Sequence, residues 1–452
     1  MIFAKRALVS DGWVLGARLT LQDGKIAQID IGQDAQAGDV RVDTLLPALG
    51  NLHSHSFQRA MAGMTEHRVT GRDNFWTWRD LMYRFTAALT PEQTEAIAAQ
   101  VFLEMQEAGF ASVGEFHYMH HQPGGMPYAD LATLSGRIIA AAKTSGIGLT
   151  HLPVLYSYGG AGQVALEHGQ ARFGNDVDTF LRLVDGAKTA MRDLPDDSIL
   201  GVAPHSLRAT SPDELRALIA ARPEGPIHMH IAEQPKEVAD IEAWLGARPV
   251  DWALAELPLD ARWCLIHATH MTDAETSGLA LSGAVAGLCP VTEANLGDGA
   301  FNGPLYLNEA GVFGVGSDSN VSISLTEELR MLEYSQRLRD LSRNVMVAGA
   351  GSVGETLYCG AATGSAQALG RDAGVIAEGR LADLVAIDSS DPTLCALGTD
   401  ALLDGLVFAA KDRVVRDVWS AGRHCVRDGR HVAHEEITAG YRKAIRELTA
   451  AL

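Results

Sequence analysis

The chain has 452 residues, of which 47% are hydrophobic and 21% are charged, a composition typical of a globular protein with one large domain and a smaller one. Its formal net charge of −19 argues against a nucleic-acid partner, because a phosphate backbone would be repelled. No apolar run reaches the roughly 18 residues of a membrane span, so no membrane partner is expected.

The N-terminal segment and the cysteines indicate the cellular compartment in which the protein is expected. Lys5, Arg6 and Asp11 interrupt the first residues, and a signal peptide would need a longer apolar core there. The five cysteines are scattered and form no CxxC pair, which disfavours a disulfide framework. We therefore expect a protein of the reducing cytoplasm.

Both ends of the chain predict short strands. Residues 13–32 alternate around Asp23-Gly24, which is the signal of a β-hairpin. Residues 381–390 and 414–432 have the same character, with turns at Ala421-Gly422 and Asp428-Gly429. We expect the two ends, residues 1–45 and 375–452, to form one small β-sandwich domain.

The middle of the chain, residues 46–374, alternates short apolar runs with helical patterns. One helix start is marked by Ser211, Pro212 and Glu214, the pattern of a capping box. Eight such alternations predict an α/β fold, a (β/α)8 TIM barrel that forms the catalytic domain. An open doubly wound sheet is the main alternative, but the glycine-rich phosphate loop that usually follows its first strand is absent from the sequence. The eight runs are residues 45–55, 111–118, 146–156, 199–207, 226–233, 262–270, 284–292 and 312–319.

Polar residues stand where most of these runs end. In a barrel, the carboxyl ends of the strands build the active site. A single strand histidine is usually a hydrogen-bonded core residue, but a series of them needs a shared partner because each buried polar group must be satisfied. A metal ion would satisfy several at once. The residues are His53, His55, His117, His205, His230, Glu233, His267 and Asp318.

The pair His53 and His55 is the clearest metal signal. Residues two apart on a strand face the same side, so both imidazoles can face the barrel axis. Alone, such a pair of histidines is weak evidence for a metal site. Together with a further histidine and Asp318 it suits one catalytic divalent ion, Zn²⁺ or alternatively Fe²⁺.

The motifs "HSH" (53–55), "HIAE" (230–233), "HATH" (267–270) and "GSDS" (316–319) resemble the mononuclear deaminase branch of the amidohydrolase superfamily. The segment "GVIAEGRLADLVAID" near the C-terminus resembles the usual end of that family. The fourth run has no counterpart of the lysine that bridges two metals, which favours one ion per subunit. The resemblance implies catalytic roles for Glu233, His267 and Asp318. It implies the metal ligands His53, His55, His230 and Asp318.

Four longer sequence segments indicate which group of this family the chain resembles most. "NLHSHSFQRAMAGMTE" (51–66), "FWTWRDLMYRF" (75–85), "EFHYMHH" (115–121) and "APHSLRA" (203–209) are similar to formimidoylglutamate deiminases. That implies hydrolysis of N-formimino-L-glutamate to N-formyl-L-glutamate and ammonia in histidine degradation, by a homodimer. Two arginines suit such a dicarboxylate, because guanidinium pairs with carboxylate in a planar, bidentate way. The implied substrate contacts are Gln58, Arg79, Tyr118, His205 and Arg208.

Other interpretations remain open at this point. The same metal chemistry serves deaminases or chlorohydrolases of heterocycles of the guanine, cytosine or triazine type, and a non-catalytic scaffold would have lost key residues. The segment "CPVTEANLGDG" (289–299) places Glu293-Ala294 where many deaminases of the branch have asparagine directly after the threonine, which weighs against a purine substrate. Arg79 follows an aromatic segment, residues 75–78, expected to be a loop over the barrel mouth, although it could instead pair with Asp80. Structural roles are expected for Arg59, His228 and Cys289. His270 is expected to lie just past its strand, outside the residues that contact the metal.

Overall fold

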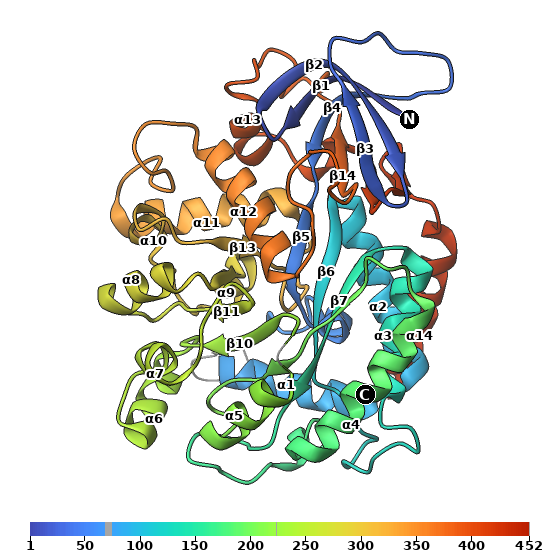
Figure 1. Cartoon of the computed structure of the whole chain (residues 1–452). Coiled ribbons are helices and arrows are strands. Elements are labelled where there is room, and N and C mark those ends of the chain that lie inside the picture. Colours follow the sequence, from blue (N-terminus) through green and yellow to red (C-terminus); the bar gives the residue numbers. More distant parts are fainter. Residues whose placement is uncertain (68–74, 223, 452) are drawn as a thin grey trace.

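A computed structural model of the chain describes residues 1–67, 75–222 and 224–451. Its centre is a ring of parallel strands surrounded by helices, and a sheet made from both chain ends lies at one end of it (Figure 1). Two sheets of the ring carry β5–β9 and β10–β13. Isolated parallel bridges join them on both sides, Val202 to Ile227 on one and Ser54 to Asp318 on the other.

Each of the eight runs predicted from the sequence contains strand residues of the ring, and β6 begins one residue before its run. An open sheet, the main alternative, would lack the bridges that join the two sheets on both sides. The strands are β5 (Leu49–Ser54), β6 (Phe110–His117), β7 (Gly148–Leu155), β8 (Ile199–Leu200), β9 (Ala203–Pro204), β10 (Ile227–Ile231), β11 (Trp263–His267), β12 (Val285–Leu288) and β13 (Phe313–Val315). Every residue of β5, β6, β7, β10 and β11 is buried, which explains why they are apolar runs rather than alternating ones.

Helices follow the strands, and α5 starts where the sequence predicted. The side chain of Ser211 accepts the N–H of Glu214, and the Glu214 side chain returns to the Ser211 N–H, so the capping box is present. The described helices are α1 (Phe75–Ala88), α2 (Pro91–Glu107), α3 (Thr133–Ser145), α4 (Val177–Ala190), α5 (Pro212–Ala221), α6 (Pro235–Leu245), α7 (Pro249–Glu256), α8 (Asp273–Ser282), α9 (Pro290–Leu296), α10 (Gly303–Asn308), α11 (Leu325–Asp340), α12 (Val353–Ala368), α13 (Leu402–Phe408) and α14 (His434–Ala451), with the short 3₁₀ turns η1 (Ser56–Met61), η2 (His168–Gln170), η3 (Met191–Asp193) and η4 (Asp412–Val414).

The two chain ends meet in one eight-stranded sheet, where β14 pairs antiparallel with β4. All three predicted turns have positive φ at both central residues: Asp23-Gly24 at 50° and 78°, Ala421-Gly422 at 41° and 75°, and Asp428-Gly429 at 49° and 78°. That geometry matches the twist of a two-residue hairpin. The strands are β1 (Ile2–Val9), β2 (Gly12–Gln22), β3 (Lys25–Asp30), β4 (Val40–Pro47), β14 (Leu384–Ile387), β15 (Val415–Ser420), β16 (Arg423–Arg427) and β17 (Arg430–His431).

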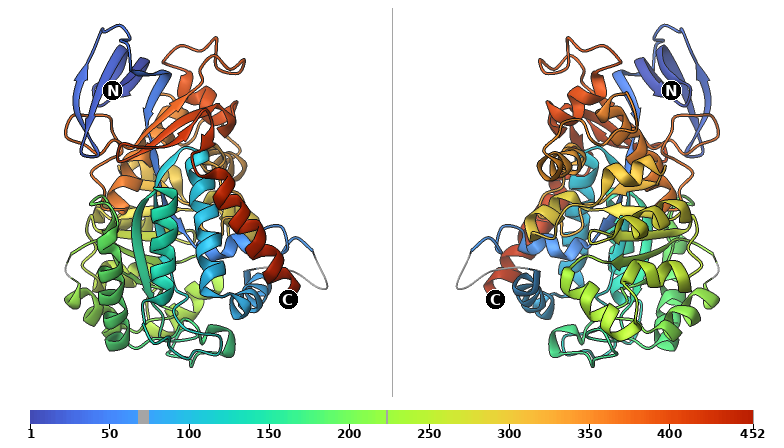
Figure 2. Two further views of the ribbon diagram at one scale, coloured as in Figure 1. Left: turned by 90° about the vertical axis from the view of Figure 1, so that its right-hand side faces the viewer. Right: turned by 90° about the vertical axis from the view of Figure 1, so that its left-hand side faces the viewer.

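The C-terminal helix leaves this sheet and runs along the barrel. Figure 2 shows α14 beside α2. His434 Nδ1 donates to Glu107 Oε1 of α2 at 2.8 Å, and the His431 N–H donates to the same oxygen at 2.9 Å. Within the described residues, no helix combines the length and the apolar character needed to cross a membrane.

Candidate active site

Three histidines and one aspartate converge at the carboxyl ends of the barrel strands. Each residue offers one nitrogen or oxygen atom as a ligand, and these four atoms all lie within 4.8 Å of one another. All four residues are buried. These are the four residues implied as ligands by the sequence, and the structure brings them together from three strands. They are His53 on β5, His55 just after it, His230 on β10 and Asp318 after β13.

The donor set fits a divalent cation. Nδ1 of His55 and Nδ1 of His230 each donate to a backbone carbonyl oxygen, at 2.9 and 3.2 Å. A neutral imidazole that donates from Nδ1 presents a lone pair at Nε2. Nε2 of His55 lies 3.2 Å from Nε2 of His53 and 3.2 Å from Oδ1 of Asp318. Electron-rich atoms gathered this closely are satisfied by a shared cation, and imidazoles with one carboxylate suit zinc or iron(II).

Burial keeps the imidazoles of this group uncharged. It lowers the pKa of His53 to about 3 and lowers the pKa values of His55 and His230. Burial alone would raise the pKa of Asp318, but the histidines around it hold that pKa well below its usual range. Neutral imidazoles and an ionised carboxylate are the forms that bind a metal.

The backbone at Asp318 and His267 is unusual. Their φ angles are 45° and 71°, a region that costs a non-glycine residue on the order of 1–3 kcal/mol and that concentrates at functional sites. Two hydrogen bonds hold Asp318 in place, because its N–H donates to the His53 oxygen and its oxygen accepts the His55 N–H, both at 2.9 Å. The loop after β13 is thereby tied to β5.

Glu233 lies beside this group in the turn between β10 and α6. Burial raises its pKa, while His267 and Arg208 act in the opposite direction. Nη2 of Arg208 lies 3.1 Å from Oε2 of Glu233, and the Glu237 carboxylate accepts the Glu233 N–H at 3.1 Å. A buried carboxyl group with a raised pKa and a fixed position is suited to carrying a proton.

His267 ends β11 and faces both acids. Its Nε2 lies 3.9 Å from Oε1 of Glu233 and 4.0 Å from Oδ2 of Asp318, while its Nδ1 lies 3.3 Å from Oε1 of Glu293. Burial alone would lower the pKa of His267, but the hydrogen bond to Glu293 and the nearby carboxylates raise it to about 10.

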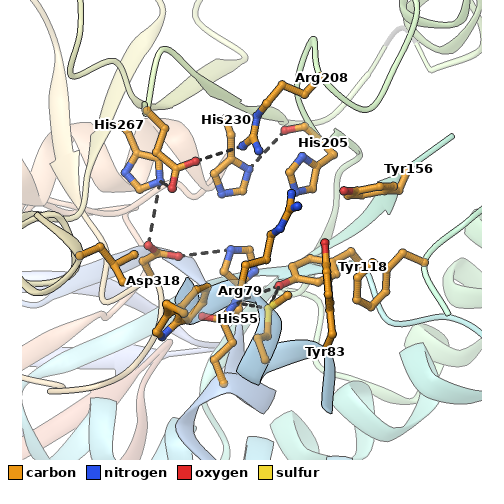
Figure 3. Close-up of a pocket in the computed structure, with 16 residues that line it drawn as sticks. His55, Arg79, Tyr83, Tyr118, Tyr156, His205, Arg208, His230, His267 and Asp318 are labelled. Atoms are coloured by element: carbon orange, nitrogen blue, oxygen red, sulfur yellow. Dashed lines mark hydrogen bonds and ion pairs between the residues drawn. The ribbon is translucent and has the colours of Figure 1, made fainter. Parts of the chain in front are cut away.

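A pocket opens over these groups (Figure 3). Nε2 of Gln58 donates to Oη of Tyr118 at 2.9 Å, and the His205 ring stacks on the ring of His230 at 4.9 Å. Its lining includes all five substrate contacts implied by the sequence: Gln58, Arg79, Tyr118, His205 and Arg208.

The aromatic segment before Arg79 is not a loop, and that expectation is wrong. Residues 75–78 begin helix α1. Trp78 and Met82 line the pocket, as do Arg79 and Tyr83, and residues four apart share one helix face. Burial of this face explains the helix despite the modest propensity of its aromatic residues. The Asp80 side chain, the alternative partner of Arg79, lies outside the described residues.

Several other pocket and site residues escaped the sequence analysis. Glu237 and Glu293 were not connected with Glu233 and His267, because both contacts depend on how separate elements pack. Only the i, i+4 spacing within residues 78–83 could have indicated that these residues share one helix face. The remaining lining residues are Trp78, Met82, Tyr83, Tyr156, Phe173 and Leu296.

His117 does not line the pocket, although it ends a strand. Its neighbour Phe116 points inward, with its ring 4.5 Å from that of His230. Successive strand residues face opposite sides, so His117 lies towards the helices, near the rings of His120 and His151.

Two of the residues for which structural roles are expected, His228 and Arg59, have contacts of that kind. Nε2 of His228 donates to a backbone oxygen at 2.8 Å, and Nε of Arg59 lies 2.9 Å from Glu104. His270 lies outside the pocket lining. Burial raises the pKa of the Cys289 thiol well above its usual value, although its sulfur lies close to His267 and Asp318.

Comparisons with known proteins agree with this geometry. Residues 44–425 match the family model "Amidohydrolase family", and residues 1–43 match "Formimidoylglutamate deiminase HutF, N-terminal domain". A formimidoylglutamate deiminase of Pseudomonas aeruginosa is 48% identical over 450 residues, which cover 99% of each chain.

Solved structures share the fold. An amidohydrolase from Brucella melitensis has 48% identity and a TM-score of 0.95, over 99% of each chain. A zinc-bound adenosine deaminase from Xanthomonas campestris has 20% identity and a TM-score of 0.81, over 99% of this chain and 98% of that one. The chain belongs to the amidohydrolase family and, within it, to the formimidoylglutamate deiminases.

Proposed function

We propose that the protein hydrolyses N-formimino-L-glutamate to N-formyl-L-glutamate and ammonia. The observation that carries the proposal is the full-length similarity to a formimidoylglutamate deiminase, 48% identical over 99% of both chains. Two arginines, Arg79 and Arg208, line the same pocket as the acid and histidine groups, which suits a substrate with two carboxylates and one amidine.

We further propose a setting and a domain organisation. The reaction belongs to histidine degradation in the cytoplasm, and the enzyme acts as a homodimer. Residues 46–374 form the catalytic domain, and residues 1–45 with 375–452 form the second domain. The shared sheet of both chain ends supports this division.

One divalent ion, zinc or alternatively iron(II), is proposed to be held by His53, His55, His230 and Asp318. When bound, such an ion lowers the pKa of water and polarises the carbon–nitrogen group under attack. Substrate binding and proton transfer are assigned to side chains of the protein.

Substrate binding comes first in the proposed mechanism. The guanidinium groups of Arg79 and Arg208 bind the carboxylates, and Gln58, Tyr118 and His205 orient the formimino end. Burial, and to a lesser extent the positive charge of Arg208, lowers the pKa of His205 well below its ordinary value. His205 therefore contacts the substrate as a neutral imidazole. It therefore recognises the amidine by a hydrogen bond without adding a second positive charge.

Proton transfer then accompanies the attack of water on the formimino carbon. His267 and Asp318 orient the water, and the ionised carboxylate of Asp318 accepts its proton. Glu233 delivers a proton to the departing nitrogen, the carbon–nitrogen bond breaks, and ammonia leaves while the carbonyl of the formyl group forms. The raised pKa of Glu233 supports this role, because a protonated carboxyl group must be accessible near neutral pH.

Ammonia release tests the proposal. Protein loaded with zinc, and separately with iron(II), is assayed with N-formimino-L-glutamate, guanine and cytosine, with metal content measured in parallel. We expect turnover of the formimino substrate only. Turnover of a heterocycle instead would support the alternative of a heterocycle deaminase, and no turnover of N-formimino-L-glutamate by metal-replete protein would refute the proposal.

A further inference from the structure

We propose that Glu293 is a positioning residue that holds His267 in its reactive orientation. The inference rests on the proposed function, because it assumes that Nε2 of His267 orients the attacking water. Glu293 belongs to the segment that departs from the usual deaminase pattern, and the proposed mechanism gives it no role.

Contacts of the Glu293 carboxylate carry the inference. The residue Glu293 is only 4% exposed. One oxygen, Oε1, accepts the Cys289 N–H at 3.0 Å and lies 3.3 Å from Nδ1 of His267. A carboxylate oxygen only accepts, so Nδ1 of His267 carries a hydrogen whether the imidazole is neutral or charged.

The consequence concerns the other ring nitrogen. With Nδ1 bound to Glu293, Nε2 is the ring nitrogen of His267 that remains to contact water or substrate. Nε2 is buried and has no hydrogen-bond partner among the described residues, yet it faces Glu233 and Asp318 at 3.9 and 4.0 Å. Glu293 therefore directs Nε2 of His267 towards the acids of the site.

His267 needs such a restraint. Its φ of 71° is an unfavourable backbone conformation for a residue with a side chain, and relaxation of this backbone would swing the ring away from the site. Glu293 is itself held at several points. Its N–H donates to the Cys289 oxygen and its carbonyl oxygen accepts the Asp298 N–H, both at 2.9 Å.

A purely structural explanation competes with this one, because the Cys289 N–H bond also secures the start of α9. The chain offers a matched control in Glu328, which is fully buried and accepts the Val291 N–H of the same helix at 3.0 Å. Its described hydrogen bonds do not include His267. Loss of helix support alone should therefore affect variants of Glu328 and Glu293 alike.

Four variants test the inference by ammonia release from N-formimino-L-glutamate. Glu293→Gln keeps an oxygen in place and should hold kcat within about fivefold of the original, whereas Glu293→Asp withdraws the carboxylate by one carbon and should lower kcat by at least about tenfold. Glu293→Met removes the acceptor and should lower kcat about 100-fold. Glu328→Met should leave kcat unchanged, and KM and metal content should stay constant in all four.

The outcomes separate the hypotheses. An active Glu293→Asp with an impaired Glu293→Gln would show that charge rather than position matters, and would overturn the inference even if Glu293→Met fails to fold. Equal losses in Glu293→Met and Glu328→Met, unchanged kcat in both Glu293→Asp and Glu293→Met, or loss of metal would overturn it too. If the unmodified protein releases no ammonia from N-formimino-L-glutamate, the proposed function fails instead.

Discussion

Arg208 gives the sharpest test of substrate recognition. Its side chain is 11% exposed and contacts Glu233 at 3.1 Å and Glu237 at 3.7 Å. Burial alone would lower the pKa of Arg208, but these two carboxylates raise it, so the residue is a fixed cation. We predict that Arg208→Ala weakens binding of the dicarboxylate substrate while the metal content stays unchanged.

The size of the effect follows from the contact that is lost. A hydrogen bond to a charged group contributes about 1.5–3 kcal/mol, and tenfold in affinity corresponds to about 1.4 kcal/mol. KM for N-formimino-L-glutamate should therefore rise by about 10- to 100-fold. Removing the cation also raises the pKa of Glu233 further, so kcat should change as well. Arg208→Lys keeps the charge and should preserve kcat better than KM.

Steady-state kinetics of ammonia release, with metal analysis of each variant, provide the measurement. Arg216→Ala is the matched control, because Arg216 lies on α5 and forms half-exposed ion pairs with Asp213 and Glu256. A KM for Arg208→Ala within about twofold of the control would place the carboxylate elsewhere, since even a weak charged contact exceeds that change.

Three further predictions concern the acid, the metal and the buried histidines. Glu233→Gln should lower kcat by about 10²- to 10⁴-fold with little change in KM or metal content; a kcat near the original would exclude Glu233 as the proton carrier. His230→Ala, or chelation of the original protein, should abolish ammonia release and bound metal together, and added zinc should restore activity only after chelation; activity without metal would contradict the proposed ligand set. Burial lowers the pKa of His151 from 6.5 to about 3. Between these pH values the unfolded chain binds a proton at His151 and the folded chain does not, so the free energy of unfolding decreases as the pH falls from 6.5 towards 3. At pH 5 this costs about 2 kcal/mol, so the drop in Tm between pH 7 and pH 5 should be smaller in His151→Leu; equal drops would show that His151 is not the cause.

The barrel and the metal group were predictable because their signals are local. Each strand is a short apolar run with a helix after it, and His53 and His55 are two residues apart on one strand. Parallel strands of a barrel end at one rim. Polar residues at the ends of distant runs, such as His230 and Asp318, therefore had to meet whatever the details of packing.

The contacts that tune the site were not predictable in the same way. Glu293 of α9 lies 3.3 Å from His267 at the end of β11, and Glu237 of α6 lies 3.7 Å from Arg208 in the turn after β9. Both contacts join elements that are separate in the sequence. The positive φ of His267 and Asp318 has no sequence signal, since neither is glycine. Helix α1 was mistaken for a loop because its burial against the pocket outweighs the local preference of its aromatic residues.

The metal group and the residues proposed to bind substrate come from different kinds of element, which explains how one fold accommodates different substrates. The metal group comes from strand ends, where a shift would break several hydrogen bonds at once. The residues proposed to meet the substrate come mainly from connecting elements, with Gln58 in η1, Arg79 in α1 and Arg208 in the turn before α5. Such elements tolerate change better than barrel strands do. A deaminase for a neutral heterocycle needs the same rim but no pair of cations above it. In this chain Arg208 shares its charge with Glu233, so the group that is proposed to bind carboxylate also biases the acid, and recognition is coupled to proton transfer.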